Sequence, residues 1–172
     1  MILEFDGVCP EINQTAYVAS TAIAAGKVQL KKNASLLFSA SARGDVNYIH
    51  IGNNSNIQDN ATLHVTHSHP CIIGDNCVIG HNAVVHGATL EENVLVGIHA
   101  TVLSGVKIGK NSIVAAGSLV AENQEIPENS MVMGSPAKVV RKTTDEEIKN
   151  ITEIAARYVN IMQHYKAIDS NG

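Results

Sequence analysis

The chain has 172 residues, of which 45% are hydrophobic, so it can build one cored domain but is short for two. A formal net charge of −4 offers no basic surface for nucleic acid or anionic lipid, and no apolar run approaches the ~18 residues of a membrane-spanning helix. We therefore expect a single domain over residues 1–172 of a cytoplasmic protein with no nucleic-acid or membrane partner.

Large rings are scarce in this chain. Aromatic residues make up 3% of it and Trp is absent, so small and β-branched side chains must fill the interior. The three cysteines, Cys9, Cys71 and Cys77, fit no metal-ligand or redox spacing, and we interpret them as reduced thiols.

Aliphatic residues recur through the middle of the chain, nearly always at steps of six. They are Ile51, Ile57, Leu63, Ile73, Ile79, Val85, Leu90, Val96, Val102, Ile108, Val114 and Val120. The segments IGNN, IGDN, IGHN and IGKN show the same unit, with Gly and then a turn-forming residue after the aliphatic one. This period predicts a parallel β-helix of hexapeptide repeats, in which three units close one coil. A sandwich of antiparallel strands would instead show alternation with hairpin signals.

The repeat also extends toward the N-terminus through Leu30, Leu36 and Ala42, which places the β-helix at about residues 12–125. After Val120 the repeat weakens, and the chain leaves it through EIPENSMVMGSPAKVVRK.

A helix is predicted after this exit segment. Thr144 and Glu147 have the spacing of a capping box. The apolar residues that follow keep three-and-four spacing: Ile148, Ile151, Ala155, Tyr158, Ile161, Met162 and Tyr165. We therefore expect one amphipathic C-terminal α-helix at about residues 144–168, packed against the coil or a neighbouring subunit.

Two histidines lie five residues apart in VIGHNAVVHG, an interval that suits the same side of neither a helix nor a strand. Their places follow from counting repeat units. The step from Leu63 to the next repeat aliphatic is ten, so VTHSHPC carries an insertion, and Leu63 and Val85 share one face in successive coils. His64 and His86 follow them directly, so both point outward and stack at ~4.8 Å. His81 belongs to the preceding face.

The same count places Arg43 beneath His64, because Ala42 lies on that face too. We interpret His64 and His86 as ligands that share a metal ion with an imidazole from a second subunit, while His81 is presented to a neighbour. Three neutral imidazoles with an open fourth position form a catalytic zinc arrangement. The alternative is that outward histidines are merely solvated or hydrogen-bonded.

Several segments together resemble one family. They are ARGDVNYIHIGNNSNIQD (42–59), His64, IGDNCVIGHNAVVHGATL (73–90), LVGIHATVL (95–103) and MVMGSPAKVVR (131–141). Over nearly the whole chain they look like the short bacterial gamma-class carbonic anhydrases. The series RGD…NIQD…H…GHxxxxHG is far more specific than the hexapeptide repeat, which acyltransferases share.

The resemblance implies a left-handed β-helix, a homotrimer and a metal between subunits, Zn²⁺ with Fe²⁺ or Co²⁺ as alternatives. Its ligands would be His64 and His86 of one subunit and His81 of the next. The implied reaction is the reversible hydration of CO2 to bicarbonate, in which a zinc-bound hydroxide attacks CO2 lying against an apolar wall.

Other site residues are also implied by the resemblance. Arg43 and Asp45 resemble an intersubunit ion pair near the metal. Gln58 resembles the residue that orients the hydroxide, with Asn56 beside it. Tyr158 matches a helix tyrosine that lies near the site in relatives, or it packs as one position of the apolar stripe.

The chain also departs from the family pattern. Val46 stands where the archetypal enzyme has Glu, and the loop HVTHSHPC has no carboxylate, so the proton shuttle is unassigned. His67 and His69 are candidate substitutes, or loop residues without a role. His99 lies in GIHA where relatives usually read GMGA, and we expect it to face solvent.

Three other functions remain open. An acyltransferase of the same fold would use a histidine as general base and need no metal. A thioesterase-like hydrolase would keep the metal but attack a thioester. A non-catalytic metal-binding scaffold would keep the histidines without turnover.

Overall fold

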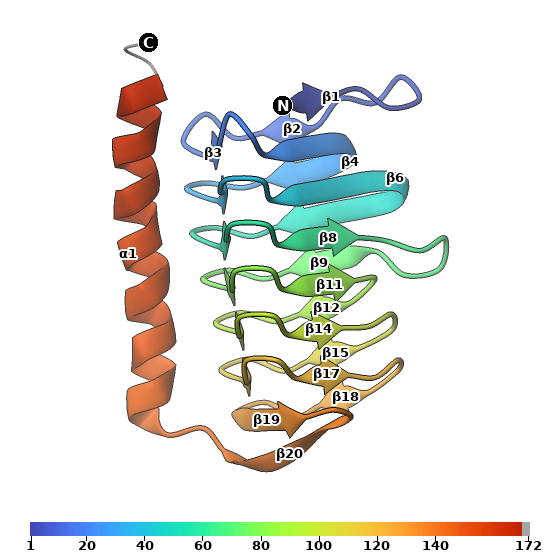
Figure 1. Ribbon diagram of the computed structural model, residues 1–172, viewed down its shortest axis with the longest axis vertical. Coiled ribbons are helices and arrows are strands. Elements are labelled where there is room, and N and C mark those ends of the chain that lie inside the picture. The colour runs from blue at the N-terminus through green and yellow to red at the C-terminus, as the bar shows by residue number, and fades with distance from the viewer. Residues whose placement is uncertain (170–172) are drawn as a thin grey trace.

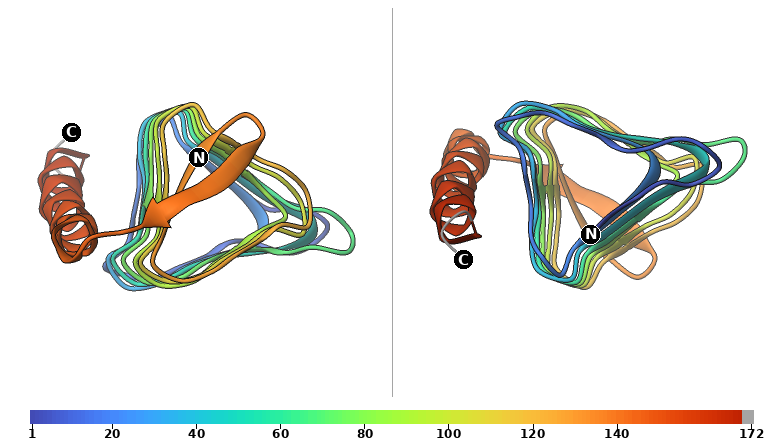
Figure 2. Two further views of the ribbon diagram at one scale, coloured as in Figure 1. Left: turned by 90° about the horizontal axis from the view of Figure 1, so that it is seen from below. Right: turned by 90° about the horizontal axis from the view of Figure 1, so that it is seen from above.

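A computed structural model describes residues 1–169, so the last three residues of the domain expected over 1–172 lie outside the described part. The chain winds into a parallel β-helix of triangular cross-section, and one long helix lies outside one side of the prism (Figures 1 and 2). The predicted fold class, a mainly β coil of hexapeptide repeats with a C-terminal helix, is confirmed.

One side of the prism is an eight-stranded sheet that lies under helix α1, and we call it the helix-covered face. Seven of its strands run parallel, one per coil. These strands are β3 (Tyr17–Val18), β5 (Ser35–Leu36), β7 (Asn56–Ile57), β10 (Val78–Ile79), β13 (Leu95–Val96), β16 (Ile113–Val114) and β19 (Ser130–Gly134).

The other two sides belong to one twelve-stranded sheet, which continues from side to side through the long strands β4 (Ile23–Leu30) and β6 (Ser41–Ile51). The side that we call the histidine face also contains β1 (Ile2–Leu3), β8 (Thr62–His64), β11 (Val84–His86), β14 (Thr101–Val102) and β17 (Leu119–Val120). The third face also contains β2 (Glu11–Ile12), β9 (Cys71–Ile73), β12 (Thr89–Leu90), β15 (Lys107–Ile108) and β18 (Glu125–Ile126).

The core lies inside the coil and consists of the repeat aliphatics. All twelve, from Ile51 to Val120, are at most 1% exposed. Full burial of one such side chain contributes about 1.5–3 kcal/mol, so the stacked coils need no aromatic interior. Cys71 and Cys77 lie in the same core as free thiols, and burial raises the pKa of each to about 12. Cys9 is free and exposed.

Asparagines turn the chain at one corner of the prism. Their φ angles lie between +55° and +59°, a left-handed conformation that Asn tolerates better than most residues. Four of the side-chain amides also donate to the asparagine of the next coil, over 2.9–3.1 Å between Nδ2 and Oδ1. They are Asn33, Asn54, Asn76, Asn93, Asn111 and Asn129.

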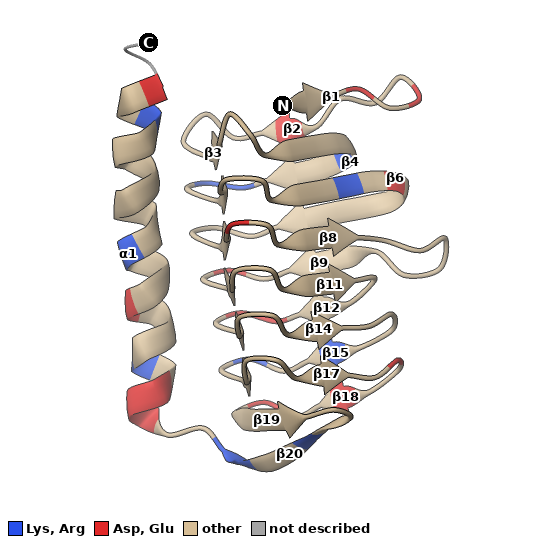
Figure 3. Cartoon of the chain, in the orientation of Figure 1, with Lys and Arg blue, Asp and Glu red and all other residues tan. Residues whose placement is uncertain are grey.

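The coil ends in a hairpin of β19 with β20 (Ala137–Lys142), and β20 crosses the end of the prism (Figure 2). Helix α1 (Asp145–Asp169) follows. The predicted capping box is present, because the Glu147 amide donates to Thr144 Oγ1 at 3.2 Å and the Thr144 amide donates to Glu147 Oε2 at 2.9 Å. Arg141 of basic strand β20 also donates to Glu147 in the acidic first turn of the helix (Figure 3).

Helix α1 runs back along the prism toward its N-terminal coils (Figure 1). Its buried residues are Ile151, Ala155 and Met162. At its far end the Tyr17 hydroxyl donates to Asp169 at 2.9 Å, so both ends of the helix are attached to the coil. No helix within residues 1–169 is long and apolar enough to cross a bilayer.

Candidate metal centre

His64 and His86 stack on the histidine face, as the count of repeat units predicted. They are paired residues of β8 and β11, and their preceding residues, Leu63 and Val85, point into the core. The ring centroids are 5.0 Å apart, and 3.0 Å separates His64 Nδ1 from His86 Nε2. Two imidazoles of one chain therefore face each other on the outer surface.

Arg43 and Asp45 continue this column from strand β6. Asp45 Oδ1 lies 3.1 Å from His64 Nε2 and accepts the Val46 amide at 2.8 Å, while Asp45 Oδ2 accepts from Arg43. Burial alone would raise the pKa of Asp45, but the Val46 amide, His64 and Arg43 together hold it below its ordinary value. The Arg43–Asp45 pair is thus formed within one chain, and its pairing across subunits stays a prediction.

Ser104 holds the second imidazole, and the sequence analysis did not single it out. Its Oγ lies 2.9 Å from His86 Nδ1. Burial, and then the charges of His64 and Arg43, lower the pKa of His86 and so favour the neutral ring. The available signal was positional: Val102 pairs with Val85, so Leu103 has the position of His86 in the next coil and Ser104 is the residue after it.

His81 lies apart from this pair, at the corner between the helix-covered face and the histidine face. Its Nδ1 is 2.8 Å from Asp59 Oδ2, and its side chain is 38% exposed. Asp59 occupies the same corner one coil earlier, since the Asn82 amide donates to the Asp59 carbonyl at 3.0 Å. The carboxylate therefore holds Nδ1 of the ring, and Nε2 is the nitrogen that remains to bind a metal ion.

The candidate ligands are thus divided over two places in one chain. Within residues 1–169, no three His, Cys, Asp or Glu side chains converge on a common point that could hold a metal ion. His64 and His86 form one partial site, and His81 with Asp59 forms another.

Gln58, Asn56 and Tyr158 lie in the half of the site that contains His81. Gln58 is 5% exposed and its Nε2 donates to Asn56 Oδ1 at 3.1 Å. Tyr158 of α1, Gln58 and His81 line a common groove of about 480 Å³. Burial, and then the charge of Asp59, raise the pKa of Tyr158.

The inserted loop after β8 carries His67 and His69. Asn47 Nδ2 donates to the His67 carbonyl at 3.2 Å, which fastens the loop to β6. His69 Nδ1 lies 3.0 Å from the Ser68 hydroxyl, so this ring is held by the loop itself, whereas His67 is exposed. His99 is exposed at the His81 corner with a φ of +58°, as expected for a solvent-facing turn residue.

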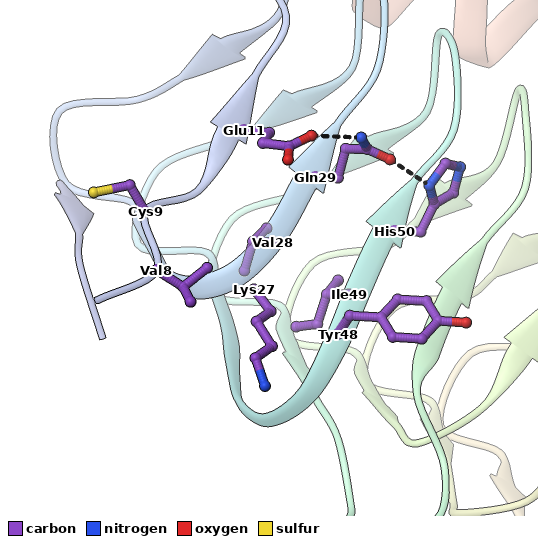
Figure 4. A pocket seen from close by; sticks show the side chains of 9 residues that line it. All are labelled: Val8, Cys9, Glu11, Lys27, Val28, Gln29, Tyr48, Ile49 and His50. Atoms are coloured by element: carbon purple, nitrogen blue, oxygen red, sulfur yellow. Dashed lines mark hydrogen bonds between the residues drawn. The ribbon is translucent and has the colours of Figure 1, made fainter. Parts of the chain in front are cut away.

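A separate hollow of about 300 Å³ lies on the third face and contains none of the predicted site residues (Figure 4). Three of its polar residues bond to one another: Gln29 Nε2 donates to Glu11 at 2.7 Å, and Gln29 Oε1 lies 3.1 Å from His50 Nδ1. The remaining lining includes Lys27 beside the apolar Val8, Val28 and Ile49.

Comparisons with known proteins agree with this fold and identify the family. The family descriptions "Bacterial transferase hexapeptide (six repeats)" and "Hexapeptide repeat of succinyl-transferase" match residues 87–122 and 70–97. A probable carbonic anhydrase of Methanocaldococcus jannaschii is 51% identical over 88% of this chain and 96% of its own length. A solved hexapeptide transferase family protein of Anaplasma phagocytophilum is 34% identical with a TM-score of 0.92, over 95% of this chain and 97% of its own.

Mitochondrial gamma carbonic anhydrase 1 of Arabidopsis thaliana is 43% identical over 92% of this chain, and the chain spans 60% of that relative's length. The chain belongs to the gamma carbonic anhydrase family.

Proposed function

We propose that the protein is a metal-dependent carbonic anhydrase of the gamma type, which hydrates CO2 to bicarbonate at sites shared between the subunits of a homotrimer. One observation carries the proposal: each of the three histidines has one ring nitrogen bonded to an outer partner. The partners are Asp45 for His64, Ser104 for His86 and Asp59 for His81.

Such outer partners are typical of metal-binding histidines, because they fix the tautomer and the orientation of the ring. The 3.0 Å between His64 Nδ1 and His86 Nε2 also suits two ligands of one ion. Two nitrogens, each 2.0–2.1 Å from zinc at a tetrahedral angle, are about 3.3 Å apart. Imidazole ligands suit Zn²⁺, which we propose as the metal, and they also accept Fe²⁺ or Co²⁺.

When bound, the metal supplies a Lewis acid that lowers the pKa of a coordinated water toward neutrality. Gln58 is suited to orient this nucleophile, because the bond to Asn56 fixes its carboxamide and leaves its carbonyl oxygen and one N–H available. Ile98, 48% exposed in the coil after His81, provides apolar surface against which CO2 can lie. Bicarbonate then leaves by exchange with water.

The proton path is proposed to run through the inserted loop, since Val46 replaces the family's first shuttle acid. His67 is better suited than His69, because His67 is exposed whereas the Ser68 hydroxyl holds the ring of His69. Histidine is the side chain most often used to transfer protons in enzymes.

The division of the ligands supports a site completed by a second copy of the chain. His81 lies on a corner, where a neighbour's histidine face can approach it, and a closed ring of three copies would repeat this contact at each interface. Arg43 and Asp45 lie next to His64 and would border the same contact.

An acyltransferase is the second candidate, favoured by the transferase repeat match and by the Anaplasma structure. Anaerobically purified protein separates the two when metal content, CO2 hydration and acyl transfer from acetyl-CoA are measured on one sample. The proposal predicts close to one metal ion per chain and CO2 hydration. Acyl transfer without bound metal would show that the protein is an acyltransferase instead. Bound metal without either activity would favour a non-catalytic metal-binding scaffold.

A further inference from the structure

The groove beside His81 extends well beyond the proposed metal site. It has a volume of about 480 Å³ and follows three successive coils between α1 and the adjacent corner of the prism. Its floor consists of the residues directly after the inward aliphatics of β10, β13 and β16, namely Gly80, Gly97 and Ala115. The glycines allow the next coil to approach closely, because a Cβ would lie 2.8 Å from Ile98 N at Gly80 and 2.5 Å from Ala116 N at Gly97, and Ala115 adds only a methyl group to the floor. This volume is typical of small-molecule sites and is far larger than CO2 requires.

The lining is polar at one end and apolar at the other. The polar end lies beside β10 and contains His81, Tyr158 and Arg157. The apolar end lies beside β13 and β16, one helical turn earlier along α1. Its aliphatic side chains are Leu95, Ile113 and Ile154. A ligand that fits the whole groove therefore has a polar head and an aliphatic tail.

Arg157 gives the polar end its positive charge. The other two arginines each bind a carboxylate, Arg43 that of Asp45 and Arg141 that of Glu147. Arg157 has no such partner among residues 1–169. Asp59, whose charge also acts on Tyr158, is already engaged by His81 at 2.8 Å. The groove thus presents an unpaired guanidinium above an aliphatic channel.

We propose that this groove binds a medium-chain aliphatic carboxylate, with the carboxylate on Arg157 and the chain along Leu95, Ile113 and Ile154. A guanidinium matches a carboxylate by two parallel hydrogen bonds. Each methylene that leaves water for the apolar end strengthens binding by about fourfold. The hollow of Figure 4 suits a carboxylate less well, because its cation, Lys27, has no planar guanidinium and the hollow also contains the carboxylate of Glu11.

Calorimetric titration of octanoate into chelator-treated protein tests the proposal without the metal as a second anion site. We expect octanoate to bind both this protein and the zinc-loaded protein, about 15-fold more tightly than hexanoate, which is two methylenes shorter. The neutral analogue 1-octanol should bind at least about fivefold more weakly than octanoate, because it leaves Arg157 unpaired.

Two variants locate the ligand. Arg157→Gln should weaken octanoate binding at least about fivefold and leave 1-octanol unchanged, whereas Lys149→Gln removes a cation from the same helix outside the groove and should change neither. Ala115→Leu, checked by circular dichroism, should weaken both ligands by filling the floor. Equal octanoate affinities of Arg157→Gln and Lys149→Gln would overturn the proposal, and so would binding that disappears with the metal. Octanoate binding without CO2 hydration would reject the proposed function alone.

Discussion

His64 and His86 occupy paired positions of β8 and β11, and their facing ring nitrogens are 3.0 Å apart. Their other nitrogens are held by Asp45 and Ser104, and Asp45 is held in turn by Arg43. The column is therefore a continuous hydrogen-bonded chain that holds two imidazoles toward one point. His81 lies at a corner outside this hydrogen-bonded column. The proposed function therefore requires a second subunit to complete the site.

Metal content is the first expected consequence. Single substitutions His64→Ala, His81→Ala and His86→Ala should each lose most of a complement that is close to one ion per chain, because two remaining imidazoles bind far more weakly than three. Metal analysis after gel filtration measures this directly.

The matched controls are His67→Ala and His99→Asn, which remove exposed histidines. Asparagine suits position 99, since Asn60 and Asn82 take the same left-handed turn conformation in the two preceding coils. Both controls should keep their metal. Full metal in all three ligand variants would refute the site.

The residues that hold the outer ring nitrogens should affect the affinity for the metal, although they do not bind it themselves. Asp59→Asn and Ser104→Ala should each weaken metal binding about 10–100-fold, because they release the orientation of His81 and His86. Competition with a chromogenic chelator gives the affinity, and the melting temperature shows whether the fold is intact. Unchanged affinity in both variants would mean that these hydrogen bonds are incidental to the metal.

Gln58→Ala should separate metal binding from turnover. We expect the variant to retain metal and to lose CO2-hydration rate by about 10–100-fold, because the proposed role of Gln58 is orientation and not ligation. Stopped-flow hydration assays at matched metal content measure the effect. Gln58→Ala also removes the hydrogen bond to Asn56 Oδ1, so the melting temperature of the variant is measured to show whether its fold is intact. Equal rates would reject this role for Gln58.

The start of α1 should show a pH-dependent stability. Hydrogen bonds from Arg141, and then from the Thr144 amide, lower the pKa of Glu147 from 4.5 to about 2. A lowered folded-state pKa adds stability that is complete above the unfolded value and is lost as pH falls toward the folded value. The melting-temperature difference between the protein and Glu147→Gln should therefore be constant near neutrality and shrink below about pH 4.5.

Thr144→Ala is the matched change at the same cap. It should cost about 1 kcal/mol of unfolding free energy, since it removes the side-chain acceptor of the Glu147 amide. A Glu147→Gln difference that grows on acidification would contradict the assignment of the lowered pKa.

The sequence was sufficient for the coil because its period is set by local geometry. A step of six places each aliphatic inside, and counting units across the insertion after Leu63 correctly stacked His64 on His86. The handedness of the coil came only from the family resemblance, since a repeat period does not encode it. The helix cap was likewise predictable, because Thr144 and Glu147 are neighbours along the chain.

The contacts of Asp59 and Ser104 were not predicted, for a physical reason. Each joins residues about one coil apart, so it depends on corner conformation and on side-chain rotamers that a repeat period does not specify. The groove was missed because helical periodicity shows that α1 is amphipathic but not how it lies across Gly80 and Gly97. Whether Tyr158 packs or serves the site was left open, and in the structure it lines the groove beside His81.

The shared site predicts that two defective chains repair each other. His64→Ala chains keep His81, and His81→Ala chains keep the His64 and His86 pair, so an interface between the two kinds of chain has all three ligands in one of its two arrangements. A ring of three places each neighbour on a different patch, so every mixed trimer should contain one complete site.

Metal analysis of co-refolded, chromatographically verified mixed trimers tests this most directly. The shared site predicts about one metal ion per mixed trimer, with CO2 hydration restored in proportion, while each variant alone stays nearly empty. A site built within one chain cannot be restored in this way, because every chain in the mixture lacks one of its own ligands. Verified mixed trimers that hold no more metal than the separate variants would contradict the shared site.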